Sequence, residues 1–102
     1  MNKEAILLIN KALSNTTRLE ILSWLKDPER HFPPHQELGH FREGVCGQFI
    51  KDKSGLSQPT ISSYLAQMHQ ANLVIPTRIG KWTYFKRNEK FIKAYLQALK
   101  AL

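Results

Sequence analysis

Residues 55–73, GLSQPTISSYLAQMHQANL, decide the fold of this chain. They begin with a tight turn at Gly55, and Ser57 is a good N-cap residue for a helix over residues 58–70. Asn72 suits the left-handed position that follows the end of a helix. A tight turn that leads into a helix of this length is typical of a helix-turn-helix.

The helix over residues 58–70 has one apolar face and one polar face. At the helical period, Ile61, Leu65 and Met68 lie within about 40° of one another and form the face that packs on the domain. An ordinary surface helix would carry Lys and Glu, whereas residues 54–77 contain no Lys, Arg, Asp or Glu. Gln, Ser and Thr side chains hydrogen bond to base edges in the major groove of DNA. The residues that we expect to read bases are Ser57, Gln58, Thr60, Ser63, Tyr64 and Gln67.

The flanking segments complete a winged helix. Apolar spacing predicts four more helices, at residues 3–13, 16–26, 45–53 and 89–102. The β-branched and aromatic residues at 74–78 and 82–87 lie on both sides of Gly80 and predict a hairpin. Pro76 places the first strand of this hairpin at an edge of the sheet.

Residues 27–44 are polar and form a connection that is long for a compact domain. A ligand lid, an added DNA contact and a plain insertion are all open interpretations of it. A chain of 102 residues has the length of one domain. We therefore expect a single domain over residues 1–102, mainly α with a small β-hairpin: a winged helix-turn-helix in the order α-α-α-α-β-β-α.

The charge of the chain favours a polyanionic partner. It has 15 Lys and Arg against 8 Asp and Glu, a formal net charge of +7. After residue 77, Glu89 is the single acidic residue among several basic ones. The residues that we expect on backbone phosphates, on the hairpin, are Arg78, Lys81, Lys86 and Arg87. Such contacts add affinity and salt dependence but little base preference.

Several classes of protein are disfavoured by composition. The longest apolar run, residues 5–9, is too short to span a membrane, and we see no signal peptide. The single cysteine, Cys46, has no internal disulfide partner, which suits a reducing cytosol. Neither a Gly-rich phosphate loop nor a paired-carboxylate site is present. We expect a cytoplasmic protein with no membrane partner, no enzyme activity and no cofactor.

Residues 55–87 resemble the ArsR/SmtB family of winged-helix repressors. The residues that carry the resemblance are Gly55-Leu56-Ser57-Gln58, Ser62–Leu65, Ala71-Asn72-Leu73 and Gly80-Lys81-Trp82, with Thr17-Arg18 and Ile21-Leu22 upstream. The resemblance implies a homodimer that binds a palindromic operator in double-stranded DNA. It also implies repression that lasts until an inducer weakens the binding.

The resemblance further implies that the first and last helices build the dimer. The helix over residues 3–13 is apolar all around, which fits a helix covered by both the core and a second subunit. The helix over residues 89–102 carries a wide apolar stripe. The residues that we expect at the dimer interface are Ile6, Leu7, Ile9, Ile92, Tyr95, Leu96 and Leu99.

The sequence departs from the family at its metal sites. Sensors of soft metals in this family carry Cys-Val-Cys in the third helix, whereas this chain has Gly44-Val45-Cys46. Zinc-type sensors place Asp and His ligands on the last helix, and residues 89–102 contain neither. We therefore expect no metal site. The histidines that we expect to be solvated loop residues rather than zinc ligands are His31, His35 and His40.

Two features allow a second interpretation. Cys46 shares an apolar face with Phe49 and Ile50 in the expected third helix, so we expect a small buried residue; a redox sensor is the alternative. We expect four aromatic residues to pack in the core and the hairpin: Trp24, Trp82, Tyr84 and Phe85. The alternative is that they line a pocket for an aromatic ligand.

Taken together, these features predict a sequence-specific transcription regulator, a dimeric repressor released by a small-molecule or redox inducer. The alternative is a winged-helix module that binds another protein or single-stranded nucleic acid. Strong, salt-dependent binding to one duplex sequence separates the two. The inducer, the operator, the regulated genes and the choice between repression and activation stay open at this level.

Overall fold

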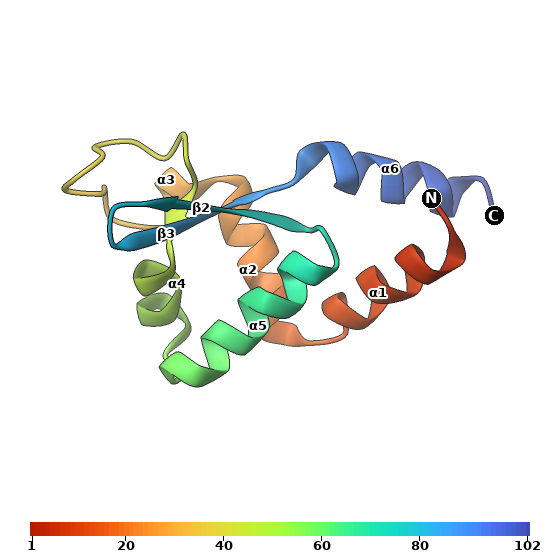
Figure 1. The fold of residues 1–102 in the computed structure, drawn as a ribbon, viewed down its shortest axis with the longest axis horizontal. Helices are drawn as coiled ribbons and strands as arrows, with labels where there is room; N and C mark the ends of the chain where they lie inside the picture. Colours follow the sequence, from red (N-terminus) through yellow and green to blue (C-terminus); the bar gives the residue numbers. More distant parts are fainter.

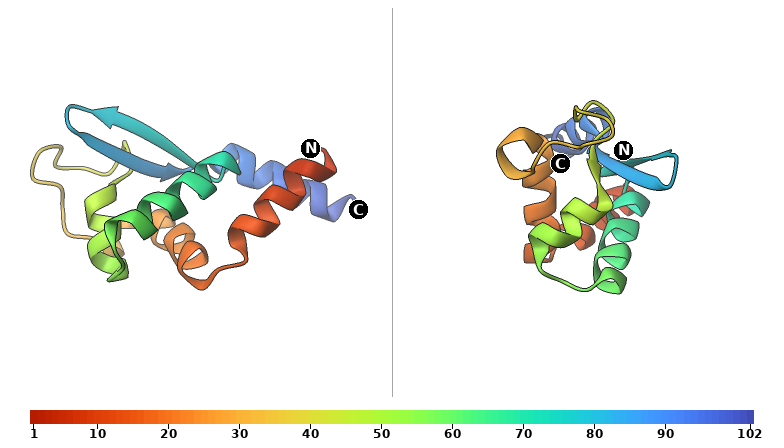
Figure 2. Two further views of the ribbon diagram at one scale, coloured as in Figure 1. Left: turned by 60° about the horizontal axis from the view of Figure 1, so that its bottom comes forward. Right: turned by 90° about the vertical axis from the view of Figure 1, so that its left-hand side faces the viewer.

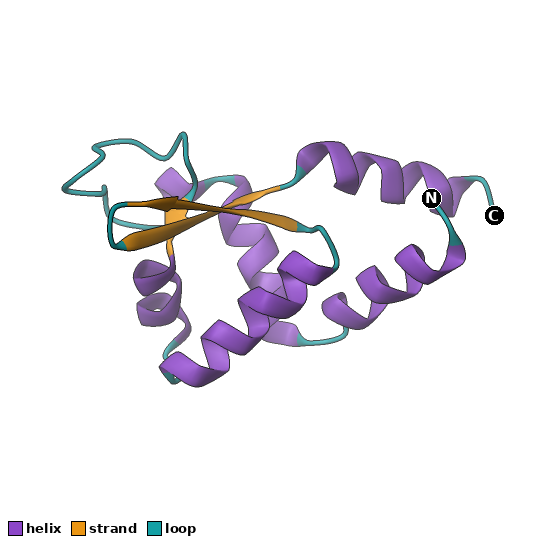
Figure 3. Ribbon diagram, in the orientation of Figure 1, coloured by secondary structure: helices purple, strands orange, loops and turns teal.

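The structure, a computed structural model, describes all 102 residues and contains six helices and a three-stranded sheet. The helices are α1 (Lys3–Leu13), α2 (Thr16–Lys26), α3 (Pro28–His31), α4 (Gly47–Ser54), α5 (Gln58–Gln70) and α6 (Glu89–Lys100). The strands are β1 (Val45–Cys46), β2 (Val74–Ile79) and β3 (Trp82–Arg87). Figures 1 and 3 show the expected winged helix-turn-helix, with α3 and β1 as additions that the sequence did not predict.

The molecule is elongated, with principal extents of 44 × 26 × 24 Å. The hairpin of β2 and β3 projects at one end, while α1, α6 and both termini lie at the other (Figure 1). Between the two ends, α2, α4 and α5 pack against the sheet (Figure 2). None of the helices is long and apolar enough to cross a membrane. The two ends of the molecule are therefore free for different contacts.

Helix α5 begins and ends at the predicted residues, Gln58 and Gln70. The Ser57 hydroxyl caps it by accepting a hydrogen bond from the N–H of Thr60, at 3.4 Å. Asn72 has a φ of 60°, in the left-handed region expected after the helix. The local signals of the decisive stretch are thus confirmed.

The sheet is antiparallel, with the strand order β1-β3-β2. The pairs of the hairpin run from Val74 with Arg87 at its base to Ile79 with Trp82 beside its tip. Strand β2 lies at an edge of the sheet, as Pro76 predicted, because proline has no N–H to donate to a further strand.

Val45 and Cys46, predicted as the start of a helix, instead form the short strand β1. They pair with Phe85 and Tyr84 of β3. Gly44 explains this path, because its φ is +102° and a Cβ at this position would lie 2.3 Å from the carbonyl oxygen of Phe85. The chain passes β3 in an extended conformation, and α4 begins only after it.

The connection over residues 27–44 contributes to the core, although its composition predicted a polar segment. Pro28 is the first residue of α3, where its missing N–H costs no hydrogen bond. Phe32 is buried with its ring edge against Trp24, at 6.3 Å between ring centres. His35 is also buried, with 5% of its surface exposed. The prediction that His35 is a solvated loop residue is therefore wrong.

One apolar cluster holds α1, α2, α4, α5 and β2 together. Its fully buried side chains include Ile9, Ile21, Ile50, Ile61, Met68 and Leu73. Ile9 was predicted at the dimer interface, but its side chain has no exposed surface within one protomer. Burial of such a side chain is worth about 1.5–3 kcal/mol. This face of α1 thus serves the core of the domain, because α1 packs on α2 and α5.

Candidate nucleic-acid interface

The turn between α4 and α5 fixes the angle of the second helix. Gly55 has a φ of +71°, a conformation that residues with a side chain rarely adopt. The Ser54 hydroxyl donates a hydrogen bond to the carbonyl of Lys51 (2.8 Å) and accepts one from the N–H of Leu56 (3.1 Å). This is the tight turn that the sequence predicted for a helix-turn-helix.

The buried face of α5 is the predicted one. Ile61, Leu65 and Met68 are at most 4% exposed. Among the expected base-reading residues, the exposed ones are Ser57, Gln58 and Ser63, and the half-buried ones are Thr60, Tyr64 and Gln67. The polar face of α5 is therefore only partly open to a partner.

Tyr64 is half-buried and contacts residues at the start of α2. The amide nitrogen of Asn15 donates a hydrogen bond to its hydroxyl, at 3.3 Å. The guanidinium of Arg18 lies 4.9 Å from the centre of its ring. Tyr64 thus joins α5 to α2, and its role in base reading stays a prediction.

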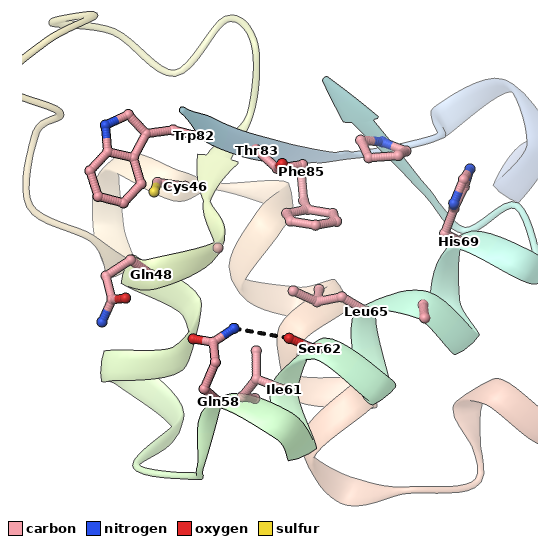
Figure 4. A pocket seen from close by; sticks show the side chains of 13 residues that line it. Cys46, Gln48, Gln58, Ile61, Ser62, Leu65, His69, Trp82, Thr83 and Phe85 are labelled. Atoms are coloured by element: carbon pink, nitrogen blue, oxygen red, sulfur yellow. Dashed lines mark hydrogen bonds between the residues drawn. The ribbon is translucent and has the colours of Figure 1, made fainter. Parts of the chain in front are cut away.

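The open face of α5 is turned toward the hairpin. Ser62, Ala66 and His69 are exposed on it, and none of the three was predicted. The Gln58 amide donates a hydrogen bond to the Ser62 hydroxyl, at 2.9 Å (Figure 4). Periodicity alone places the polar face opposite the buried one, but α1 and α2 cover one flank of α5. The small size of Ser62 and Ala66 is the one signal in the sequence that points to a close approach by a partner.

A cavity of about 440 Å³ separates α5 from the hairpin (Figure 4). Its lining includes Gln58, Ser62 and His69 from α5, Pro76 and Thr83 from the hairpin, and Gln48 from α4. No Lys, Arg, Asp or Glu side chain lines it. This groove therefore offers uncharged hydrogen-bonding groups.

The tip of the hairpin carries two of the predicted cations. Arg78 lies opposite Thr83, and its guanidinium donates hydrogen bonds to the Gly80 carbonyl (2.9 Å) and the Thr83 hydroxyl (3.4 Å). The Lys81 ammonium lies 5.3 Å from the ring centre of Trp82. Because side chains alternate along a strand, Arg78 and Thr83 share the sheet face of Phe85, which lines the groove.

The other two predicted cations, Lys86 and Arg87, lie near the base of the hairpin. The Arg87 side chain is 12% exposed and forms an ion pair with Glu89, at 3.0 Å. It also donates a hydrogen bond to the carbonyl of Leu22, at 3.4 Å. Alternation places Lys86 on the sheet face opposite that of Phe85. Arg87 thus joins β3 to α2, and neither residue extends the basic tip.

The end of the molecule formed by α1 and α6 exposes apolar side chains. Leu7 is 64% exposed and Leu96 is 59% exposed, and Leu99 is exposed as well. Of the other residues predicted at a dimer interface, Ile6 is buried, while Ile92 and Tyr95 are partly buried against the core. Exposed leucines that the prediction did not include are Leu8 and Leu102. Five exposed leucines on or beside two helices at one end of the molecule are more apolar surface than single scattered residues would give.

Cys46 is buried, as predicted, although it lies in a strand. Its N–H donates a hydrogen bond to Nε2 of His35, at 3.2 Å. Nδ1 of His35 therefore carries the ring hydrogen and donates to the carbonyl of His40, at 3.1 Å. His35 is a neutral structural residue with both nitrogens engaged. The structure contains no group of three or more His, Cys, Asp or Glu residues placed to hold a metal ion.

The chain is similar to one curated relative and to several solved structures. The relative, described as the uncharacterized HTH-type transcriptional regulator YbzH of Bacillus subtilis (strain 168), is 48% identical over 90 residues, 88% of this chain and 90% of the relative. No protein-family model matches the chain.

The solved structures share the fold. The crystal structure of an ArsR family transcriptional regulator has a TM-score of 0.74 at 13% identity, over 99% of this chain and 88% of the other. HlyU from Vibrio cholerae N16961 has a TM-score of 0.66 at 21% identity, over 97% and 94% of the two chains. NolR from Sinorhizobium fredii has a TM-score of 0.64 at 24% identity, over 96% and 83%. The fold that the resemblance implied is thus confirmed.

Proposed function

Since this chain belongs to the HTH-type transcriptional regulators and has the winged-helix fold of ArsR-family proteins, we propose that it binds a palindromic operator as a homodimer and represses transcription until an inducer weakens this binding. The observation that carries the proposal is the exposed, uncharged polar face of α5 beside the basic tip of the hairpin. A regulator of this kind acts in the cytoplasm, where bacterial DNA lies.

Helix α5 is the element that would enter the major groove. That groove, about 12 Å wide, admits an α-helix. Gln58, Ser62 and Ser63 would meet base edges, because they lie in the N-terminal half of α5 and the N-terminal residues of a recognition helix contact the bases. Arg78 and Lys81 on the hairpin tip would contact phosphates and supply the affinity that an uncharged helix lacks.

The exposed leucines of α1 and α6 support a homodimer. These helices lie at the end of the molecule opposite the hairpin tip (Figure 1). A two-fold axis at this end would bury Leu7, Leu96 and Leu99 and leave both wings pointing outward. Two equivalent reading helices then match two half-sites about one turn of DNA apart.

Selection of bound duplexes from random DNA tests base reading. We expect a palindrome with A·T-biased contacted positions, because α5 has no Arg or Lys for guanine and Gln58 suits adenine. Binding to the selected duplex, measured by fluorescence anisotropy, should fall steeply as salt rises. G-rich half-sites would contradict the base assignment. A preference for single strands, or no enrichment, would favour the alternative of a different winged-helix module.

Sedimentation of a Leu96→Glu variant tests the dimer. The charge should convert a dimer into monomers and weaken operator binding, because each monomer reads only one half-site. Leu19→Glu is the matched control, since Leu19 is 52% exposed and belongs to α2 rather than to α1 or α6. A monomeric wild type, or equal effects of both variants, would contradict the proposed interface.

A further inference from the structure

A second cavity, of about 450 Å³, lies on the other side of β3, between residues 33–37 and the sheet. Its size is within the range of small-molecule sites, which is about 300–1,000 Å³. The groove beside α5 would be occupied by DNA in the proposed function, whereas this cavity has no part in base reading.

Aromatic rings form much of the wall of this second cavity. Phe49 comes from α4, and Trp82 and Tyr84 come from β3. His35 also lines it, but both of its ring nitrogens are already bonded within the protein. It therefore serves as a flat, neutral wall and offers no hydrogen bond to a ligand.

The charge of the cavity is opposite to that of the chain. Glu37 is the one charged residue in the lining, in a protein with a formal net charge of +7. Its carboxylate accepts a hydrogen bond from the indole N–H of Trp82, at 3.2 Å. Burial raises the pKa of Tyr84, which also lines the cavity, and the nearby Cys46 and Glu37 raise it further. The Glu37 side chain is exposed, so its carboxylate beside the indole ring can attract a cation and repel an anion.

One face of the Trp82 ring is already occupied by a cation of the protein, so a ligand would have to use the rest of the ring. The Lys81 ammonium lies over its ring, at 5.3 Å from the ring centre. The face of an indole ring is the aromatic surface that cations prefer. The residue with the strongest cation-binding ring thus also donates to the one carboxylate of the cavity.

We propose that this cavity binds a small organic cation with an aromatic body, its ammonium group on Glu37 and its ring among Phe49, Trp82 and Tyr84. Trp82 is the first residue of β3, next to the hairpin tip. A ligand that binds Glu37 competes with the hydrogen bond from the Trp82 indole. It would therefore change the position of Trp82, which lies next to the hairpin tip. This effect on DNA binding rests on the proposed function, whereas the binding site itself does not.

The two tryptophans of the chain make a direct test simple. In a ¹⁵N-labelled protein they give two indole N–H resonances, which a Trp24→Phe variant assigns. The probe is phenethylammonium, with 2-phenylethanol as its neutral match and 3-phenylpropionate as its anionic match. We expect a saturable shift of the Trp82 resonance with the amine, in the millimolar range typical of so small a ligand. The alcohol should bind more weakly and the carboxylate should not bind.

Variants of Glu37 test the proposed contact. Glu37→Gln should weaken binding of phenethylammonium by about tenfold and remove its advantage over the alcohol, because a charge-assisted hydrogen bond is lost. Glu37→Asp keeps the charge and should keep the preference. Glu43→Gln, in the same connection but outside the cavity lining, is the matched control. The Trp24 resonance reports whether each variant is folded.

Three results would overturn the proposal: no saturable shift with the amine, equal binding of the carboxylate or the alcohol, or equal effects of Glu37→Gln and Glu43→Gln. These titrations contain no DNA. A failure of operator binding would leave them unchanged, so the two proposals can fail separately.

Discussion

The two sides of β3 carry surfaces of different origin. Toward α5, Thr83 and Phe85 face a regular helix across the groove, and most of that groove comes from helices and strands with clear periods. On the other side, Tyr84 packs against His35, at 5.1 Å between ring centres, within an irregular connection. The difference shows that the proposed reading surface depends on local sequence rules, whereas the aromatic cavity depends on how a long connection folds back.

Cys46 lies between these two surfaces. It lines both cavities, and it pairs with Tyr84 across the sheet. Its N–H is also the group that ties β1 to His35. Cys46, the one cysteine that the chain keeps from the Cys-Val-Cys pattern of the family, thus connects the two sides of the sheet through β1.

Gly44→Ala is expected to have the largest effect, on the connection side. Its Cβ would meet the Phe85 carbonyl oxygen at 2.3 Å, so β1 would have to separate from β3. We expect a loss of more than about 3 kcal/mol in the free energy of unfolding in urea. Gly39→Ala, also at positive φ but with nothing within 4 Å, should cost only about 1 kcal/mol. Equal losses would mean that the close approach to β3 is not needed.

His35→Ala should cause the next largest loss in the free energy of unfolding. It removes the acceptor of the Cys46 N–H and the ring between Phe41 and Phe49, whose centres lie 4.7 and 4.9 Å away. A buried donor without a partner and a lost ring together cost about 2–4 kcal/mol. His69→Ala, on the exposed face of α5, should change unfolding by less than about 0.5 kcal/mol. A small effect of His35→Ala would mean that residues 27–44 are a plain insertion that adds little to stability.

On the α5 side, substitutions should change DNA binding rather than stability. Lys81→Ala should weaken binding to all duplexes alike and reduce the salt slope by about 1, whereas Gln58→Ala should change base preference by about 1–3 kcal/mol. Lys93→Ala is the control, because Lys93 is exposed on α6, at the end of the molecule opposite the hairpin tip. Anisotropy titrations at several salt concentrations measure all three. If Lys81→Ala changed base preference and Gln58→Ala weakened binding to all duplexes alike, the roles assigned to the hairpin and to α5 would be wrong.

The smallest expected effect is on alkaline stability. Burial, with Cys46 and Glu37 nearby, raises the pKa of Tyr84 in the folded protein. The folded state therefore holds this proton more tightly than the unfolded state, whose tyrosine pKa is about 10. The resulting stabilisation is complete below that pH and is lost as the pH rises through the folded pKa. Tyr84→Phe should reduce the fall of Tm with pH in the alkaline range. An unchanged dependence of Tm on pH would mean that the phenol is exposed to water.

The sequence by itself determined the elements with a strong local period. The bounds of α5, its cap at Ser57, the left-handed Asn72 and the edge position of β2 all follow from interactions between residues close in the chain. Such signals need no knowledge of the rest of the fold. The polar face of α5 is also predicted by the sequence of the helix alone.

Tertiary structure decided which of these surfaces stay open. Tyr64 is half-buried because α2 lies on one flank of α5, and Ile9 is buried because α1 packs on the core. His35 is buried because a connection of ordinary polar composition folds onto β3, and Gly44 allows this through an approach that only a residue without a side chain permits. These outcomes depend on contacts between residues far apart in the chain, which periodicity along one segment does not contain.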